Sequence, residues 1–216
     1  MAAADKPTLF HSPNTRSAGT LILLEELAAP YELHVINMKA GEQRKPAYLA
    51  INPMGKVPAI KHGDTLVTEQ GAIFIYLADL FPGAGITPVI GDPLRGSFLR
   101  WLVYYGSSFE PAVVDRALKR DPAPQAMSPY GDFDTMLGTV SGQLKRATYM
   151  CGEKFTAADV LWGTAINWML AFKLVPESPE FMRYRDRIVA RPAFKKVTAM
   201  DKNLAAEHEA AVAKPA

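Results

Sequence analysis

Three short segments in the first third of the chain combine polar side chains with exposed backbone groups. The first is the turn Ser12-Pro13-Asn14-Thr15-Arg16-Ser17, which leads directly into a predicted helix. A helix N-terminus has free N–H groups and a partial positive charge, so it stabilises an anion placed there. The hydroxyls of Ser12, Thr15 or Ser17 could donate hydrogen bonds to that anion, and Arg16 adds a positive charge. The alternative interpretation is ordinary N-capping of the helix.

The other two segments are dipeptides. Pro58 follows Val57 at the start of a predicted strand, where a proline fits only at a sheet edge or as a cis residue that exposes neighbouring backbone groups. Glu69-Gln70 lies between a predicted strand and a predicted helix. Helix-start N–H groups could hold a carboxylate there, while Glu69 could receive an ammonium group; simple capping by an acid is the alternative.

These segments lie in a region where strand and helix patterns alternate. The predicted elements, in order, are a strand over 8–11, a helix over 17–28, a strand over 31–36, a short helix ending near 50, strands over 57–60 and 65–68, and a helix over 70–81. The first two strands flank a helix, so we expect them to be parallel. A tight turn joins the last two strands, so we expect an antiparallel hairpin.

A linker over 84–92, marked by glycine and proline, divides this predicted domain (residues 5–83) from a second one over 93–216. The second part is predicted to be entirely helical. Its first helix carries aromatic residues at helical spacing and is expected to bend or end at Pro111. Further helices are expected over 131–149, 157–172 and 179–190, and after Pro192. Thr156-Ala157-Ala158-Asp159 is typical of a capping box, and we interpret Asp159 as structural.

Composition excludes several classes of protein. The 216 residues include 24 Lys and Arg and 22 Asp and Glu, and the net charge of +2 favours neither a nucleic acid nor a membrane as partner. Cys151 is the single cysteine, which excludes an intrachain disulfide framework and a CxxC redox pair. Histidine spacing does not favour a metal site. The first residues do not resemble a secretory signal, and we expect a cytoplasmic protein.

The pattern as a whole resembles the cytosolic glutathione transferases, in particular bacterial members of the serine type. Four stretches carry the resemblance in this order: Leu9 to Pro13, Asn52 to Ile60, Thr68 to Ile73 with Tyr76 to Asp79, and Phe155 to Asp159. The family implies an N-terminal thioredoxin-like βαβαββα domain followed by an all-helical domain. It also implies that the protein binds glutathione as co-substrate and forms a homodimer.

The resemblance assigns roles to individual residues. Val57, before a cis Pro58, pairs through its backbone with the cysteinyl part of glutathione. Glu69 and its follower bind the γ-glutamyl end; relatives usually have Glu-Ser, whereas this chain has Glu69-Gln70, and an amide can also hydrogen-bond a carboxylate. The remaining candidates, for the glycyl carboxylate, are Gln43, Arg44 and Lys56, with a solvated surface position as the alternative for each.

The resemblance also implies that a hydrogen bond lowers the pKa of the glutathione thiol, because the thiolate is the reactive species. Phe10 or His11 occupies the position of a catalytic tyrosine, and Arg16 stands where some relatives have a cysteine. Ser12, followed by proline, is therefore the first candidate for the donor. The alternatives are Asn14, Thr15 and Ser17, with Arg16 as electrostatic support.

The predicted activity is addition of the glutathione thiolate to a hydrophobic small-molecule electrophile, as in detoxification. The electrophile pocket is expected between the domains, and its candidate contacts are Tyr104, Tyr105, Ser108 and Phe109, although an aromatic stripe is more often core. Dehalogenation, isomerisation or peroxide reduction with the same thiolate is one alternative. A non-catalytic glutathione-binding stress or interaction protein is another.

Overall fold

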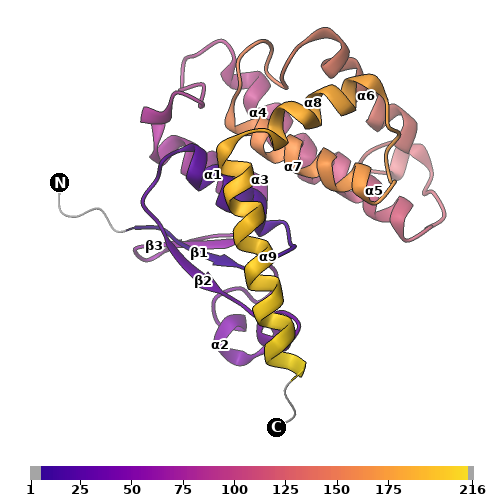
Figure 1. Ribbon diagram of the computed structural model, residues 1–216. Helices are drawn as coiled ribbons and strands as arrows, with labels where there is room; N and C mark the ends of the chain where they lie inside the picture. The colour runs from indigo at the N-terminus through magenta and orange to yellow at the C-terminus, as the bar shows by residue number, and fades with distance from the viewer. Residues whose placement is uncertain (1–5, 214–216) are drawn as a thin grey trace. The chain divides into compact units, whose positions relative to one another are not determined.

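A computed structural model describes residues 6–213 of the chain (Figure 1). Residues 1–5 and 214–216 lie outside this range. The segment that we interpreted as lacking a secretory signal therefore lies partly outside the described residues. The same holds for the outermost ends of the two predicted domains. Within residues 6–213, no helix is both long enough and apolar enough to span a membrane.

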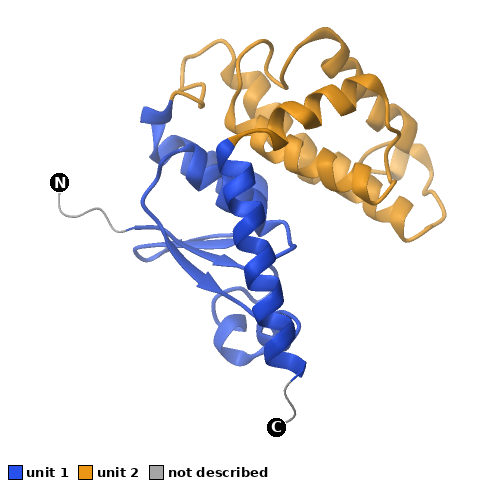
Figure 2. Cartoon of the chain, in the orientation of Figure 1, with its two compact units in different colours: residues 1–84, 192–216 blue, residues 85–191 orange. Residues whose placement is uncertain are grey.

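The contacts within the chain divide it into two compact units, shown in different colours in Figure 2. The first comprises residues 1–84 together with 192–216, and the second comprises residues 85–191. The final helix is thus grouped with the N-terminal part of the chain. The predicted domain boundaries at 83 and 93 stay a prediction.

The first unit contains a four-stranded mixed sheet in the order β2-β1-β3-β4. The strands are β1 (Thr8–His11), β2 (Glu32–Val35), β3 (Ala59–His62) and β4 (Thr65–Val67). β1 pairs with β2 in parallel, and β3 is antiparallel to both β1 and β4. The predicted parallel pair and hairpin are therefore confirmed. The strand predicted from residue 57 instead begins at Ala59, because Pro58 has no N–H for the ladder. The Val57–Pro58 peptide bond is cis.

Helices α1 (Ser17–Glu26), α2 (Pro46–Leu49), α3 (Gln70–Leu80) and α9 (Pro192–Ala213) complete this unit. α1 packs against both α3 and α9. Leucine and isoleucine residues of α1 have almost no exposed surface, as do Ile73, Phe74 and Leu77 of α3. The burial of these apolar faces fixes the start of α1, and with it the turn that precedes α1.

The second unit is helical, as predicted, and contains α4 (Arg95–Tyr104), α5 (Glu110–Ala117), α6 (Phe133–Arg146), α7 (Ala157–Ala171) and α8 (Pro179–Val189). The expectation that Pro111 bends or ends the first helix is wrong in its detail. The chain forms a single π turn over Tyr105–Phe109 and then continues as α5, with Pro111 in its first turn. A proline is tolerated in a first turn because its missing N–H would have no partner there.

Trp162 of α7 lies at the centre of the second unit. Its indole N–H donates to the Trp101 backbone oxygen at 3.0 Å. Its ring contacts those of Tyr105 and Phe109, with centroids 5.8 and 4.9 Å away. The next residue, Gly163, allows α8 to approach closely, because a Cβ there would lie 2.5 Å from Ile188.

Candidate functional site

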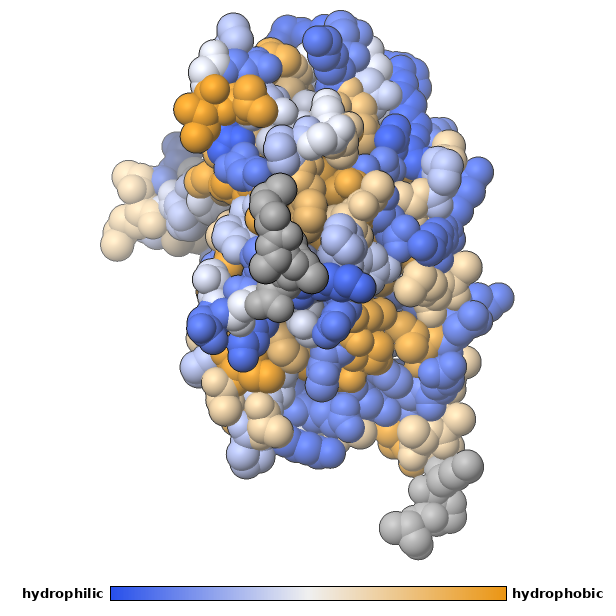
Figure 3. Space-filling view, turned by 90° about the vertical axis from the view of Figure 1, so that its left-hand side faces the viewer, coloured by the Kyte–Doolittle hydropathy of each residue, from blue (hydrophilic) through white to orange (hydrophobic). Residues whose placement is uncertain are grey.

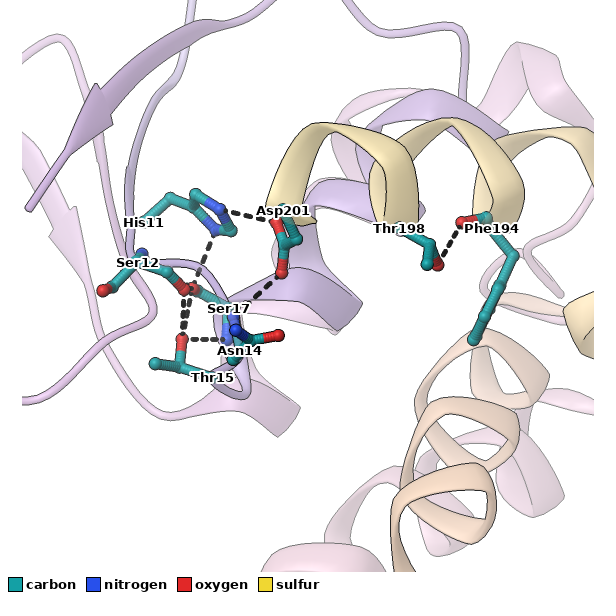
Figure 4. Close-up of polar contacts among 8 residues, drawn as sticks. All are labelled: His11, Ser12, Asn14, Thr15, Ser17, Phe194, Thr198 and Asp201. Atoms are coloured by element: carbon teal, nitrogen blue, oxygen red, sulfur yellow. Dashed lines mark hydrogen bonds and ion pairs between the residues drawn. The ribbon is translucent and has the colours of Figure 1, made fainter. Parts of the chain in front are cut away.

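The turn from Ser12 to Ser17, called the Ser12 turn below, is held by its own hydroxyl groups (Figure 4). Ser17 Oγ accepts a hydrogen bond from the Ser12 backbone N–H at 3.1 Å and lies 2.9 Å from His11 Nδ1. Thr15 Oγ1 lies 2.7 Å from both Ser17 Oγ and the Ser12 backbone oxygen. The hydroxyls of Thr15 and Ser17 are therefore used inside the turn.

Ser12 differs from these two residues. Its side chain is almost completely buried, yet its hydroxyl makes no hydrogen bond to any part of the chain between residues 6 and 213. In Figure 4 this hydroxyl points away from the cluster formed by His11, Thr15 and Ser17. Among the three hydroxyls of the turn, that of Ser12 is the one left to donate a hydrogen bond to a bound group.

The two other candidates from the turn have exposed side chains. Asn14 adopts a positive φ of 56°, which asparagine tolerates better than most residues. Its backbone N–H donates to Asp201 Oδ2 at 3.0 Å. Arg16 precedes the first residue of α1 and does not cap the helix through its side chain. Neither observation gives Asn14 or Arg16 a role in sulfur activation.

The loop before Pro58 is fixed by two donors on one carbonyl group. The backbone oxygen of Lys56 accepts from the hydroxyl of Tyr48 at 2.6 Å and from Asn52 Nδ2 at 2.9 Å. Burial raises the pKa of Tyr48 to about 12, so this hydroxyl keeps its proton at neutral pH. Within the described residues, the backbone N–H and C=O of Val57 have no hydrogen-bond partner. They are available to an extended peptide.

The pairing of β1 with β3 places Val57 and Ser12 at the same end of the sheet. In the antiparallel pairing of β1 with β3, Thr8 lies opposite Lys61, and Phe10 lies opposite Ala59. Ser12 directly follows the end of β1, and Val57 lies two residues before the start of β3, so both lie at the same end of this antiparallel strand pair. A peptide paired with the Val57 backbone would therefore lie at the end of the sheet where the Ser12 turn begins, and this placement is the main geometric feature of the site.

Glu69 and Gln70 lie at the start of α3. The exposed Glu69 adopts φ 62° and ψ 117°, a backbone conformation that costs a non-glycine residue about 1–3 kcal/mol and is found mainly at functional sites. Gln70 Nε2 donates to the Arg16 backbone oxygen at 2.9 Å. The amide thus ties α3 to the Ser12 turn, a role that the sequence did not indicate, and one N–H of the amide remains for a ligand.

Gln43 and Arg44 lie in a short 3₁₀ helix (Glu42–Arg44), and Lys56 lies in the loop that approaches this helix at Gly55. Gly55 has a positive φ of 60°, and a Cβ there would lie 2.8 Å from the Gln43 backbone oxygen, so glycine permits the close approach. Arg44 Nη1 contacts the Met54 backbone oxygen at 3.4 Å. The side chains of Arg44 and Lys56 are exposed and Gln43 is half-buried. Their role in binding a carboxylate stays a prediction.

The four predicted electrophile contacts belong to the second unit. Tyr105 and Phe109 are buried against Trp162 and form part of the core of this unit. The hydroxyl of the half-buried Tyr104 donates to the Met136 backbone oxygen at 3.1 Å, and Ser108 is also half-buried. The electrophile pocket itself stays a prediction.

Sequence reasoning missed two residues next to the Ser12 turn, His11 and Asp201. His11 Nε2 lies 3.0 Å from Asp201 Oδ1, and both residues are buried. A weak signal existed in the sequence. Asp201 lies four residues after Val197, and these are the two buried residues of α9 among those described, so a carboxylate occupies the apolar face of the helix.

Within residues 6–213, no cluster of three or more His, Cys, Asp or Glu side chains is arranged to hold a metal ion. The predicted lack of a metal stays a prediction.

Comparison with known proteins gives the same family for both parts of the chain. Residues 6–79 match the glutathione S-transferase N-terminal domain, and residues 113–192 match the glutathione S-transferase C-terminal domain. The glutathione S-transferase GstA of Escherichia coli O157:H7 is 31% identical over 189 residues, covering 85% of this chain and 93% of the relative. A glutathione S-transferase of Hyoscyamus muticus is 27% identical and covers 87% of this chain and 95% of the relative.

Solved structures agree. A ternary complex of BphK, described as a bacterial glutathione S-transferase, has a TM-score of 0.76 at 25% identity and covers 90% of this chain and 99% of that one. A glutathione transferase homologue from Sulfitobacter, solved with bound glutathione, has a TM-score of 0.73 at 28% identity and covers 93% and 99%. Relatives come from bacteria, plants and fungi, so the predicted bacterial origin stays a prediction.

Proposed function

Because the chain belongs to the glutathione S-transferase family and is a glutathione transferase, we propose that it is a serine-type member in which Ser12 activates the sulfur. The unpartnered hydroxyl of Ser12 donates a hydrogen bond to the sulfur of bound glutathione and so stabilises the thiolate. The thiol proton leaves to solvent, and the thiolate forms a C–S bond with an electrophilic carbon of an apolar compound. Removal of such compounds would make the protein a detoxification enzyme.

The observation that supports this assignment best is that Ser12, directly after β1, and Val57, two residues before β3, lie at the same end of this antiparallel strand pair. The cysteinyl part of glutathione pairs with the free backbone groups of Val57, as an added strand does at a sheet edge. Its sulfur then lies beside the Ser12 hydroxyl. Thr15 and Ser17 are weaker candidates, because their hydroxyls already hold the turn together.

The remaining residues bind the two ends of glutathione. Glu69 receives the α-ammonium group of the γ-glutamyl end, while the N–H groups at the start of α3 and the free amide N–H of Gln70 hold its carboxylate. Arg44 and Lys56, together with Gln43, attract the glycyl carboxylate at the opposite end. Tyr104 and Ser108 are the contacts proposed for the electrophile, with Tyr105 and Phe109 supporting them from the core.

The test is titration of the thiolate absorbance of bound glutathione in Ser12→Ala, with Thr15→Ala as the matched hydroxyl deletion. We expect Ser12→Ala to raise the pKa of the bound thiol by about one unit or more, which corresponds to about tenfold less thiolate at neutral pH. Thr15→Ala should raise it less. An unchanged titration in Ser12→Ala, with glutathione still bound, would contradict the proposed role.

We also propose that the protein is a cytoplasmic homodimer. Large apolar side chains are exposed in the first unit at Met54, Leu66 and Leu80, and Leu66 lies on β4, an edge strand of the sheet. On the face shown in Figure 3, hydrophobic side chains form patches between hydrophilic ones. Such patches favour contact with another protein surface. Light scattering on the purified protein, with Leu66→Lys as the interface variant, measures the mass directly; a monomeric wild type would contradict the proposal.

A further inference from the structure

The last helix, α9, reaches the Ser12 turn through Asp201. One carboxylate oxygen, Oδ2, accepts the backbone N–H of Asn14 at 3.0 Å. The other, Oδ1, lies 3.0 Å from Nε2 of His11, the residue that ends β1 and immediately precedes Ser12. Figure 4 shows Asp201 facing both residues. A single side chain therefore holds the turn on both sides of Ser12.

His11 continues this chain of contacts to the backbone of Ser12. His11 Nε2 faces the Asp201 carboxylate, so the tautomer with the ring proton on Nε2 directs a donor toward it. In that tautomer Nδ1 is an acceptor, and Ser17 Oγ–H donates to it across the 2.9 Å contact. This direction leaves the lone pairs of Ser17 Oγ for the backbone N–H of Ser12, 3.1 Å away.

The groups that connect Asp201 to the Ser12 turn are buried. His11 and Ser17 have no exposed surface, and Asp201 has 6%. A buried carboxylate next to a buried imidazole is costly unless both are oriented by their partners, and such pairs hold a local geometry strongly. An apolar pair at these positions would also keep α9 packed against α1. The presence of a buried carboxylate therefore indicates a role beyond attachment of the helix.

We propose that His11 and Asp201 form a positioning pair that orients the Ser12 hydroxyl toward the sulfur of glutathione. This inference rests on the proposed role of Ser12. Neither residue touches the substrate; both act through the backbone of the Ser12 turn. The last helix of the chain therefore tunes the acidity of a thiol bound at the end of the first strand.

The sign of one measurement separates this role from a simple charge effect. Asp201→Asn removes a negative charge near the sulfur, and that change alone would favour the thiolate and lower its pKa. Loss of positioning would weaken the hydrogen bond from Ser12 and raise the pKa. We expect the pKa of bound glutathione in Asp201→Asn to rise by about half a unit to one unit, which is a roughly three- to tenfold loss of thiolate at neutral pH.

A double-mutant cycle tests the route through Ser12. If Asp201 raises the thiolate population only through Ser12, adding Asp201→Asn to Ser12→Ala should not raise the thiol pKa any further; only the charge effect, which lowers the pKa, remains. Glu209→Gln is the matched control, because Glu209 also joins α9 to another part of the first unit, through an exposed ion pair with Lys39. It should leave the pKa unchanged.

Each outcome is decisive. A pKa that falls or stays constant in Asp201→Asn, while Ser12→Ala raises it, overturns the positioning pair and leaves the role of Ser12 intact. Additive effects overturn the route through Ser12. If Ser12→Ala has no effect, the proposed function of Ser12 and this inference fail together. Should Asp201→Asn not fold, His11→Ala and His11→Gln give the same test: the amide of glutamine can reach Asp201, so it should restore most of the pKa shift lost in His11→Ala.

Discussion

Two buried aspartates, one in each unit, are surrounded by hydroxyl and backbone N–H groups, and they differ in what their surroundings leave unused. In the second unit, Asp159 Oδ1 accepts from the Met150 N–H and the Tyr184 hydroxyl, and Oδ2 accepts from both the N–H and the hydroxyl of Thr156. Every oxygen lone pair has a donor. This cluster contains the predicted capping box at the start of α7.

In the first unit, Asp201 holds the Ser12 turn in a similar way, but the Ser12 hydroxyl and the backbone of Val57 remain without partners within the described residues. A fully satisfied buried polar cluster stabilises a fold, whereas unused donors at a fixed position can bind a ligand. The comparison teaches that the two clusters share their chemistry and that unused groups distinguish the cluster around Ser12, which we propose to be the functional one.

The substitution with the largest expected effect removes Asp159 from the fully hydrogen-bonded cluster of the second unit. Asp159→Ala removes the carboxylate acceptor of two buried N–H groups and two hydroxyls, and we expect it to lower the free energy of unfolding by roughly 3–5 kcal/mol. Urea denaturation measures this loss. Asp132→Ala is the control, because Asp132 caps α6 in an exposed position, and its loss should be clearly smaller. Equal losses would contradict the comparison.

The pH dependence of stability sharpens the same point. Burial raises the pKa of Asp159 to about 6, although its hydrogen bonds act in the opposite direction. A pKa raised in the folded state contributes stability below the unfolded value of about 4, and this contribution is lost as the pH rises through about 6, up to roughly 3 kcal/mol. When the urea midpoint is plotted against pH between 4 and 7, the slope should therefore differ between the wild type and Asp159→Asn. Parallel curves would rule out this assignment.

At Glu69, in the proposed glutathione site of the first unit, a substitution can increase stability while it weakens binding. Glu69→Gly relieves the strained backbone at φ 62° and should raise the free energy of unfolding by about 1 kcal/mol. It should also weaken glutathione binding about tenfold, since it removes the proposed partner of the ammonium group. Calorimetry and urea denaturation report the two effects. Glu69→Gln keeps the strain and should change only the affinity; if Glu69→Gly binds normally, Glu69 is not a ligand contact.

The smallest effect concerns the protein's own thiol, which lies beside the satisfied cluster. Burial raises the pKa of Cys151 to about 11, and the thiolate is the reactive form. We expect Cys151→Ser to leave turnover within about twofold of wild type, and the native protein to react with a thiol reagent much more slowly than the urea-unfolded chain. Rapid labelling of the folded protein would place Cys151 among the reactive groups.

The sequence by itself determined the features that depend on neighbours along the chain. Alternating and helical periodicities located the strands and helices, and Thr156 with Asp159 indicated the capping box, because these features depend on residues within one or two turns of backbone. Proline after Val57 left a sheet edge and a cis bond as alternatives, and the family resemblance implied the cis bond. Element ends were less accurate: the helix predicted over 131–149 spans Phe133–Arg146, where the Asp132 carboxylate begins it. Pro111 was misjudged because the π turn before it is not visible in local spacing.

The tertiary structure decided which polar groups are used and which are free. The contact of His11 with Asp201, the bond from Gln70 to the Arg16 carbonyl and the backbone conformation of Glu69 join or strain segments far apart in the sequence. Such contacts depend on how α1, α3 and α9 bury their apolar faces, and a local pattern does not encode that packing. The sequence thus indicated three candidate hydroxyls in the Ser12 turn. The fold distinguishes Ser12 from the other two, because the hydroxyls of Thr15 and Ser17 make hydrogen bonds within the turn.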